Sequence, residues 1–265
     1  MYARDFFETA ILNLANNQTI SHPSKMYVAL LYSNPGESGA YAEVNYQGYA
    51  RQEISFSAPV SGTGSHYIQN SEMITFAEST ETAQTATHIG IFDNANSNTG
   101  NMWLYGALDQ TIAITPGVSP IFQIGSIKFT LSGKISSAYR VKILNTLRGE
   151  DGEDCAGFIP YFGCAIGDID VSVNNEFSGT NYSRVQISFS TPDNLSSGAM
   201  AIHNTDTFAT DYAGSNWGSW AYTVVFDNST VGSGGAFYYS SRTPNNIYKG
   251  GACGYNAGDL VLTIN

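Results

Sequence analysis

Apolar side chains recur at helical spacing in two places, near residue 10 and near residue 143. The first set lies three or four residues apart, as side chains on one helix face do, and consists of Phe6, Phe7, Ala10, Ile11 and Leu14. The second set has the same spacing and consists of Tyr139, Ile143, Leu144 and Leu147. Gly149 follows the second set and is a typical helix-terminating residue. The pattern predicts two short helices, one near the start of each half of the chain.

The chain after each helix carries the short apolar runs that are typical of β-strands. In 51–59, Ile54 and Phe56 alternate with polar residues, which predicts a strand with one face in a core. The run 87–94 leads into an asparagine-rich loop and then into 102–108, which predicts a hairpin. Further strands are expected at 26–32 and 127–133. Such strands between turn clusters predict an all-β fold of antiparallel, jelly-roll-like β-sandwiches, with a helix at one end.

A long motif occurs twice in the chain. EVNYQGYARQEISFSAP (43–59) returns as EFSGTNYSRVQISFSTP (176–192), 133 residues further on. Shorter blocks return in the same order at offsets of 132 to 134, among them TFA with TFA, IFDN with VFDN, and GSIKFTL with GDLVLTI. Ordered blocks at a nearly constant offset indicate an internal duplication. We therefore expect two tandem modules, 1–133 and 134–265, each a helix followed by a β-sandwich.

The residues that both copies keep are expected to be structural. They include Tyr49 with Tyr182 and Arg51 with Arg184. Tyrosine and arginine at the start of a core strand suit a turn and a buried cation bonded to carbonyl groups. We therefore interpret the repeated motif as part of the fold.

The chain is acidic, with 11 basic and 22 acidic residues among 265 and a formal charge of −11. An acidic surface repels phosphate backbones and anionic lipid, so neither nucleic acid nor membrane is expected as a partner. The first residues lack the pattern of a secretion signal. Cys155, Cys164 and Cys253 are too few for a disulfide framework; Cys155 and Cys164 could pair locally, although buried thiols are favoured. These features favour synthesis and folding in a cytoplasm.

Residues with catalytic or metal-binding chemistry are scarce. The chain has four histidines: His22, His66, His88 and His203. None has a second histidine or cysteine at metal-ligand spacing, and no catalytic motif occurs in a suitable context. The acidic run 149–155 could attract Ca²⁺, but without the alternating carboxylates of a calcium loop it favours a solvated turn between modules. We therefore expect no enzyme activity, catalytic residue, cofactor or metal.

Aromatic residues gather in the second half, in NWGSWAY and AFYYSSR. The candidates for a surface or glycan contact are Trp217, Trp220, Tyr222 and Tyr239. Aromatic faces beside asparagine, serine and aspartate suit stacking on a sugar or a protein interface. In alternating strands about half of such rings point inward, so a core role competes with a surface role. Both interpretations stay open.

The first half carries an ordered series of motifs: YVALLYSNPGESG, EVNYQGYARQEISFSAP, ITFAEST, THIGIFDN, WLYGAL and GSIKFTL. This series resembles a module of tailed bacteriophages that is usually described as a phage tail fibre protein. The second half departs from it, with TNYSR, AYTVVFDN and FYYSSR in place of the corresponding motifs. The resemblance therefore covers the first half, and the second half depends on the internal repeat.

The resemblance implies a β-rich, non-enzymatic virion component that is assembled in the host bacterial cytoplasm. It implies other virion proteins and copies of the chain itself as partners, with a host surface glycan as a further candidate. A role in the tail or tail fibres, in assembly or host attachment, is the preferred hypothesis. A capsid decoration protein and a carbohydrate-binding module are the alternatives.

Overall fold

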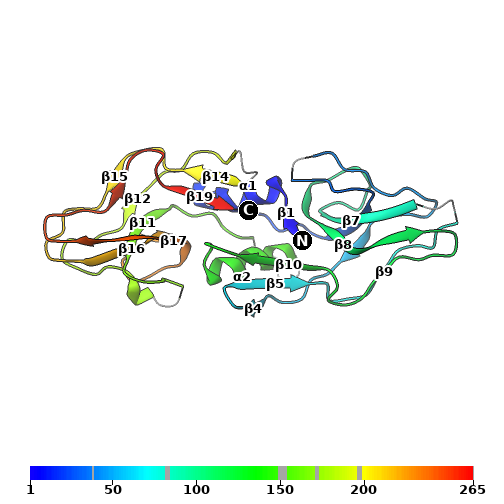
Figure 1. Cartoon of the computed structure of the whole chain (residues 1–265), viewed down its shortest axis with the longest axis horizontal. Helices are drawn as coiled ribbons and strands as arrows, with labels where there is room; N and C mark the ends of the chain where they lie inside the picture. The colour runs from blue at the N-terminus through cyan, green and yellow to red at the C-terminus, as the bar shows by residue number, and fades with distance from the viewer. Residues whose placement is uncertain (38, 81–83, 149–153, 171–172, 196–198, 265) are drawn as a thin grey trace. The chain divides into compact units, whose positions relative to one another are not determined.

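The part of the chain that the structure describes is all-β except for two short α-helices and two 3-10 turns (Figure 1). The computed structural model describes residues 1–37, 39–80, 84–148, 154–170, 173–195 and 199–264. The chain divides into two compact units. The first comprises Met1–Thr9, Ser21–Leu131 and Ile143–Cys155, and the second comprises Ala10–Ile20, Ser132–Lys142 and Ala156–Asn265. Most of each unit thus comes from one half of the sequence, and each also includes a short segment of the other half.

The first unit is built on a five-stranded antiparallel sheet. Its strands, in spatial order, are β1 (Tyr2–Ala3), β8 (Met102–Ile114), β7 (Gln84–Phe92), β2 (Met26–Leu31) and β3 (Gln52–Ile54). The predicted hairpin is confirmed as β7 and β8, which pair from Gln84 with Ile114 to Phe92 with Met102. In β2, five of the six residues are buried. A strand covered on both faces has no polar side to alternate with, which explains its continuous apolar run.

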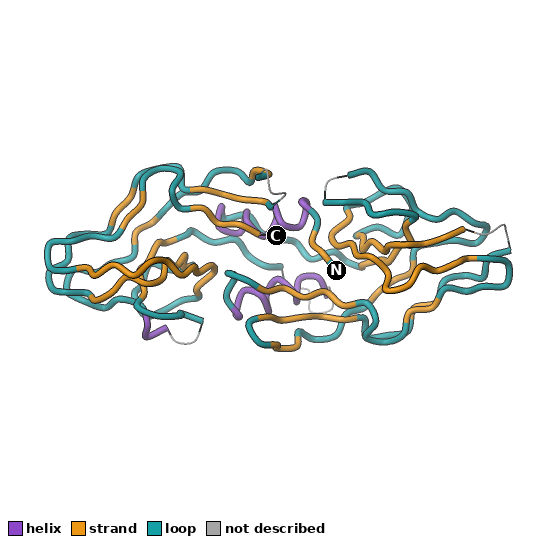
Figure 2. The backbone as a smooth tube through the Cα atoms, in the orientation of Figure 1, coloured by secondary structure: helices purple, strands orange, loops and turns teal. Residues whose placement is uncertain are grey.

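The described residues of the first unit also form two smaller sheets. The three-stranded sheet has the order β10 (Lys128–Ser132), β5 (Ser65–Gln69), β4 (Val60–Gly62), and the two-stranded sheet pairs β6 (Ile74–Thr75) with β9 (Ile121–Phe122). The strands of these two sheets have two to five residues each. Loops make up much of the chain between the strands (Figure 2).

The expected strand at 51–59 is divided between two sheets. Gln52–Ile54 pair with β2, whereas Phe56 forms an isolated antiparallel bridge with Asn70, directly after β5. Ile54 and Phe56 are 4% and 1% exposed, as the alternation predicted. The segment therefore puts successive core side chains where two sheets meet, which explains why the alternation continues past the end of β3.

The second unit has corresponding sheets. Its four-stranded sheet has the order β12 (Val185–Gln186), β11 (Tyr161–Ala165), β16 (Gly218–Phe226), β17 (Ala236–Ile247); its three-stranded sheet is β13 (Asp193–Asn194), β14 (Met200–His203), β19 (Val261–Ile264); and β15 (Phe208–Ala209) pairs with β18 (Gly254–Tyr255). Phe189 bridges Asn204 as Phe56 bridges Asn70. The repeated motif thus passes from one sheet to the next in the same way in both units.

Strand partners correct one of the sequence alignments. Ile74 pairs with Phe122 in the first unit, and Phe208 pairs with Tyr255 in the second. Ile74 and Phe208 therefore occupy corresponding positions, 134 residues apart. The two TFA blocks, aligned at an offset of 132, are two residues out of register, so that part of the alignment was wrong.

The two predicted helices are confirmed as α1 (Asp5–Asn13), followed by a 3-10 turn at Leu14–Asn16, and α2 (Ser137–Arg148) (purple in Figure 2). The apolar positions that predicted them include the fully buried Phe7, Ile11, Leu14, Ile143, Leu144 and Leu147. Neither helix, among the residues that the structure describes, is long and apolar enough to cross a membrane.

The segment that ends α1 belongs to the second unit and is hydrogen-bonded there. The backbone N–H of Phe158 donates to the carbonyl of Leu14 at 2.9 Å. The side-chain amide of Asn16 donates to the carbonyl of Ser190 at 3.0 Å. Because these bonds join residues far apart in sequence, residues 10–20 are an integral part of the second unit.

The segment that ends α2 belongs to the first unit in a corresponding way. Arg148 Nε lies 3.5 Å from the carbonyl oxygen of Phe56, the core residue of the repeated motif. Further along, the Asp154 carboxylate accepts a hydrogen bond from the backbone N–H of His22 at 2.9 Å. Each unit therefore takes up a segment from the other half of the sequence.

Gly157 offers a test of the segment in the second unit. A Cβ at this position would overlap the backbone of Asn17 and Gln18. Backbone atoms cannot move aside as a flexible side chain can, so we expect Gly157→Ala to lower the free energy of unfolding by about 1–3 kcal/mol. Denaturant titration of the full chain measures the effect. The control is Gly232→Asn, since Gly232 has a positive φ of 74° that asparagine tolerates and nothing within 4 Å; equal costs for the two changes would contradict the tight contact.

Candidate functional site

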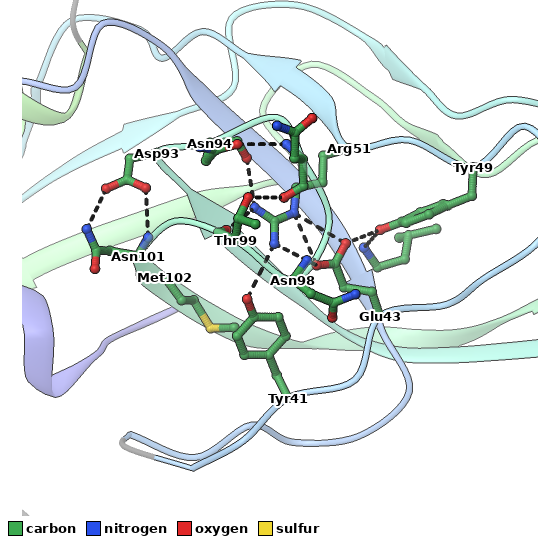
Figure 3. A network of polar contacts seen from close by, with 12 residues as sticks. Tyr41, Glu43, Tyr49, Arg51, Asp93, Asn94, Asn98, Thr99, Asn101 and Met102 are labelled. Carbon is green, nitrogen blue, oxygen red and sulfur yellow. Dashed lines mark hydrogen bonds and ion pairs between the residues drawn. The ribbon is translucent and has the colours of Figure 1, made fainter.

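Glu43 and Arg51 of the repeated motif form a buried ion pair in the first unit (Figure 3). Arg51 Nη2 lies 2.6 Å from Glu43 Oε1, and both side chains are at most 3% exposed. Arg51 Nη1 donates to the carbonyls of Asn94 (2.7 Å) and Thr99 (2.9 Å), in the loop between β7 and β8. The guanidinium also lies over the ring of Phe92, 3.6 Å from its centroid. The predicted buried cation bonded to carbonyls is confirmed, and it holds the β7–β8 loop.

Tyr49 is the third member of this network. Its hydroxyl donates to Glu43 Oε2 and accepts from the backbone N–H of Leu30 in β2, both at 3.1 Å. Burial raises the pKa of the Tyr49 phenol, and the neighbouring carboxylate raises it further, so the phenol keeps its proton. Burial also acts to raise the pKa of Glu43, but hydrogen bonds from Arg51 and from the backbone of Asn98 outweigh it and hold that pKa below its ordinary value of 4.5. The Glu43 carboxylate therefore stays ionised at neutral pH.

The second unit contains the same network. Arg184 Nε lies 2.7 Å from Glu176 Oε1, with both side chains at most 2% exposed. Arg184 Nη1 donates to the carbonyls of Asn228 (2.7 Å) and Ser233 (2.9 Å), before β17. The Tyr182 hydroxyl donates to Glu176 Oε1 at 3.2 Å. In each unit the arginine, the glutamate and the tyrosine are hydrogen-bonded to corresponding groups of that unit. This agreement indicates that the two networks have a structural role.

The lowered pKa of Glu43 predicts a pH dependence. A carboxyl whose pKa is lower in the folded chain than in the unfolded chain adds stability at pH values above its unfolded value, here near 4.5, and that stability is lost as pH falls through the folded value. We therefore expect the melting temperature to fall with acidification below about pH 4.5. Thermal melts between neutral pH and about pH 3 measure this. Glu43→Gln removes the titrating group, so an equally steep fall in that variant would contradict the assignment.

The four aromatic candidates do not form one exposed patch. Trp217 and Trp220 are 7% and 4% exposed, so both indoles lie in the core of the second unit, which is the core role that the sequence left open beside a surface role. Tyr222 and Tyr239 are half-buried and pack against a cluster of four buried residues, Ala165, Ile169, Val224 and Phe226. A glycan contact at these four residues stays a prediction.

Sequence reasoning missed two buried asparagines that organise both units. Asn70, fully buried, donates through Nδ2 to the carbonyls of Glu72 and Gln123 and accepts at Oδ1 from the N–H of Ile127, all at 2.8 Å. Asn204 makes the equivalent three bonds in the second unit. The repeated pattern of asparagine, hydroxyl residue and acidic residue, NSE at 70–72 and NTD at 204–206, is a signal that could have found them.

Each unit has an open pocket lined by the last residue of β9 or β18 and by residues that follow that strand. The second unit's pocket has a volume of about 430 Å³, and its lining includes Thr207, Phe208, Arg242, Tyr255, Asn256 and Asp259. The first unit's pocket has about 370 Å³ and is lined in part by Leu108, Phe122 and Ser126. The sequence did not predict either pocket, because the lining residues come from segments far apart in the chain.

The remaining candidate residues have local roles. All three cysteines are buried thiols outside any disulfide, so the preference for buried thiols over a Cys155–Cys164 disulfide is confirmed. The hydrogen bond from His22 to Asp154 lies in the first unit. Residues 149–153 of the acidic run, considered for Ca²⁺, lie outside the described residues.

Comparison with known proteins gives one family match. Residues 3–130 match the model of the family described as "Podophage GP4 fiber I protein gp80". No curated protein matches the chain in sequence. The matched segment contains the Glu43–Arg51 network and ends near the predicted boundary between copies, at 133. The first half of this chain is therefore similar to a podophage fibre protein, and the match supports a phage-fibre, virion family.

Proposed function

We propose that this chain is a non-enzymatic structural component of a phage virion, associated with the tail or its fibres and acting in assembly or host attachment. The match of residues 3–130 to a podophage fibre family carries this proposal. The all-β fold also supports a structural role. The buried arginines of the two glutamate–arginine–tyrosine networks donate hydrogen bonds to loop carbonyls of their own units. We propose the virion as its location, with other virion proteins and further copies of this chain as partners.

We further propose that the second half is a diverged tandem copy of the first. Three corresponding features support this: the order of the sheets, the glutamate–arginine–tyrosine network and the buried asparagine. The family match ends at residue 130, so the second half is the part in which new properties are expected.

Localisation on the virion tests the tail proposal. Gold-labelled antibodies against the chain are applied to intact virions, and the copy number is measured by quantitative mass spectrometry. We expect label on the tail and a copy number that follows tail symmetry, about six or twelve. Label over the head, with copies on the order of hundreds, would support capsid decoration instead and overturn the tail proposal.

A further inference from the structure

The pocket of the second unit has aromatic walls and a cation at one side. Tyr255 lies between Phe208 and Trp220, with ring centroids 6.0 Å and 5.7 Å away. The guanidinium of Arg242 lies over the indole of Trp220, with its Cζ 3.4 Å from the ring centroid. The buried indole therefore does not contact a ligand itself but supports the arginine that lines the pocket.

Arg242 has hydrogen-bonding capacity to spare. The chain has six arginines, and the other five donate hydrogen bonds to carbonyls, carboxylates or other acceptors. Within the described residues Arg242 has neither a hydrogen bond nor an ion pair, and its Nη1 is buried without a partner. A guanidinium in this state gains most from an anionic acceptor with two oxygens, such as a carboxylate.

The other lining residues fit hydroxyl groups and an apolar ring face. Thr207, Asn256 and Asp259 are exposed, and Asp259 Oδ2 accepts from the side-chain amide of Asn256 at 3.1 Å. Their side chains can donate to or accept from sugar hydroxyls, while the half-buried Phe208 and Tyr255 can cover the C–H face of a pyranose ring. A volume of about 430 Å³ is in the range of small-ligand sites.

The first unit provides an internal comparison. Tyr105 and Tyr239 occupy corresponding ladder positions, opposite Gly90 and Val224, so three residues further on Leu108 corresponds to Arg242. Phe122 corresponds to Tyr255 in the same way, since each pairs with the first residue of β6 or β15. The first unit thus has neither the free cation nor the phenol at these positions, and the polar pocket is particular to the second unit.

We infer that the pocket around Arg242 binds a saccharide that carries a carboxylate. Arg242 binds the carboxylate, the hydroxyls meet Thr207, Asn256 and Asp259, and the ring lies against Tyr255. This inference deepens the attachment role in the proposed function and rests on it for its biological meaning. The binding itself does not depend on where the chain sits in the virion.

Saturation-transfer NMR on the full chain tests the pocket. The probes are N-acetylneuraminic acid, methyl glucuronide and methyl glucoside, the last two differing only in the carboxylate. We expect at least one acidic sugar to bind and methyl glucoside to bind more weakly. Arg242→Leu introduces the residue that stands at this position in the first unit. It should lower the affinity for the acidic sugar by about tenfold or more, as loss of a hydrogen bond to a charged group does.

Lys249→Leu is the matched control, because it removes an exposed cation of the same unit that does not line the pocket. It should leave the affinity unchanged. Near-ultraviolet circular dichroism checks that Arg242→Leu is folded, and Arg242→Gln replaces it if it is not. Absence of binding by both acidic sugars, or equal effects of the Arg242 and Lys249 changes, would overturn the inference. Either result leaves the virion-labelling experiment to decide the proposed function independently.

Discussion

Replacing Arg51 by methionine is expected to lower the free energy of unfolding by about 3–5 kcal/mol. The change leaves the Glu43 carboxylate, which is 3% exposed, without its cation. It also leaves the carbonyls of Asn94 and Thr99 without their donor. Methionine keeps apolar contact with Phe92. The lost free energy of unfolding therefore comes from the missing charge and hydrogen bonds more than from a cavity. Denaturant titration of the full chain, followed by tryptophan fluorescence, measures it.

An exposed ion pair of the same unit supplies the control. Lys25 Nζ lies 2.7 Å from Glu53 Oε2, about as close as the buried pair, but the two side chains are 55% and 49% exposed. Lys25→Met should change the free energy of unfolding far less than Arg51→Met does, because water and side-chain entropy offset most of such an exposed contact. Arg184→Met should match Arg51→Met, since its network has the same partners in the second unit. If Arg51→Met costs no more than Lys25→Met, the network does not hold the fold.

The elements that sequence patterns predicted well are those with a strong apolar period. α1, α2, β2 and the β7–β8 hairpin follow directly from apolar spacing and turn residues. β4 and β5 were not predicted, because SHYIQ mixes polar residues with only one fully buried aliphatic side chain, Ile68. Edge and paired strands of this kind are stabilised by tertiary pairing more than by their own composition.

Two features could not be predicted from the pattern: the burial of the indoles, and the inclusion of residues 10–20 and 143–155 in the unit formed mainly by the other half of the sequence. Two residues lie between Trp217 and Trp220, and one of them is the left-handed Gly218. A register shift follows Trp220 in β16, so simple alternation does not assign the sides of the two indoles. The placement of residues 10–20 in the second unit depends on long-range bonds such as that between Phe158 and Leu14. Arg242 was overlooked as a candidate because its significance lies in having no hydrogen-bond or ion-pair partner among the described residues, which only three-dimensional contacts reveal.

Phe56→Ala is expected to cost about 3–5 kcal/mol, because it removes a ring that is 1% exposed from the place where two sheets meet. The surrounding strands are fixed by the bridge between Phe56 and Asn70 and collapse into the space only in part. Met73→Ala, at a side chain that is 56% exposed in the same unit, is the control and should cost within about 0.5 kcal/mol.

Hydrogen exchange shows how far the effect of Phe56→Ala extends. Arg148 at the end of α2 donates to the Phe56 carbonyl, and residues 143–155 belong to the first unit. Loosening this part of the first unit should therefore speed amide exchange in 143–148 as well as in β2, β3 and β5, by a factor that follows the lost stability. Exchange in β16 should change less, because that strand belongs to the second unit. Faster exchange confined to residues before 133 would contradict the inclusion of the α2 end in the first unit, and with it the view that each half of the sequence completes the fold of the other.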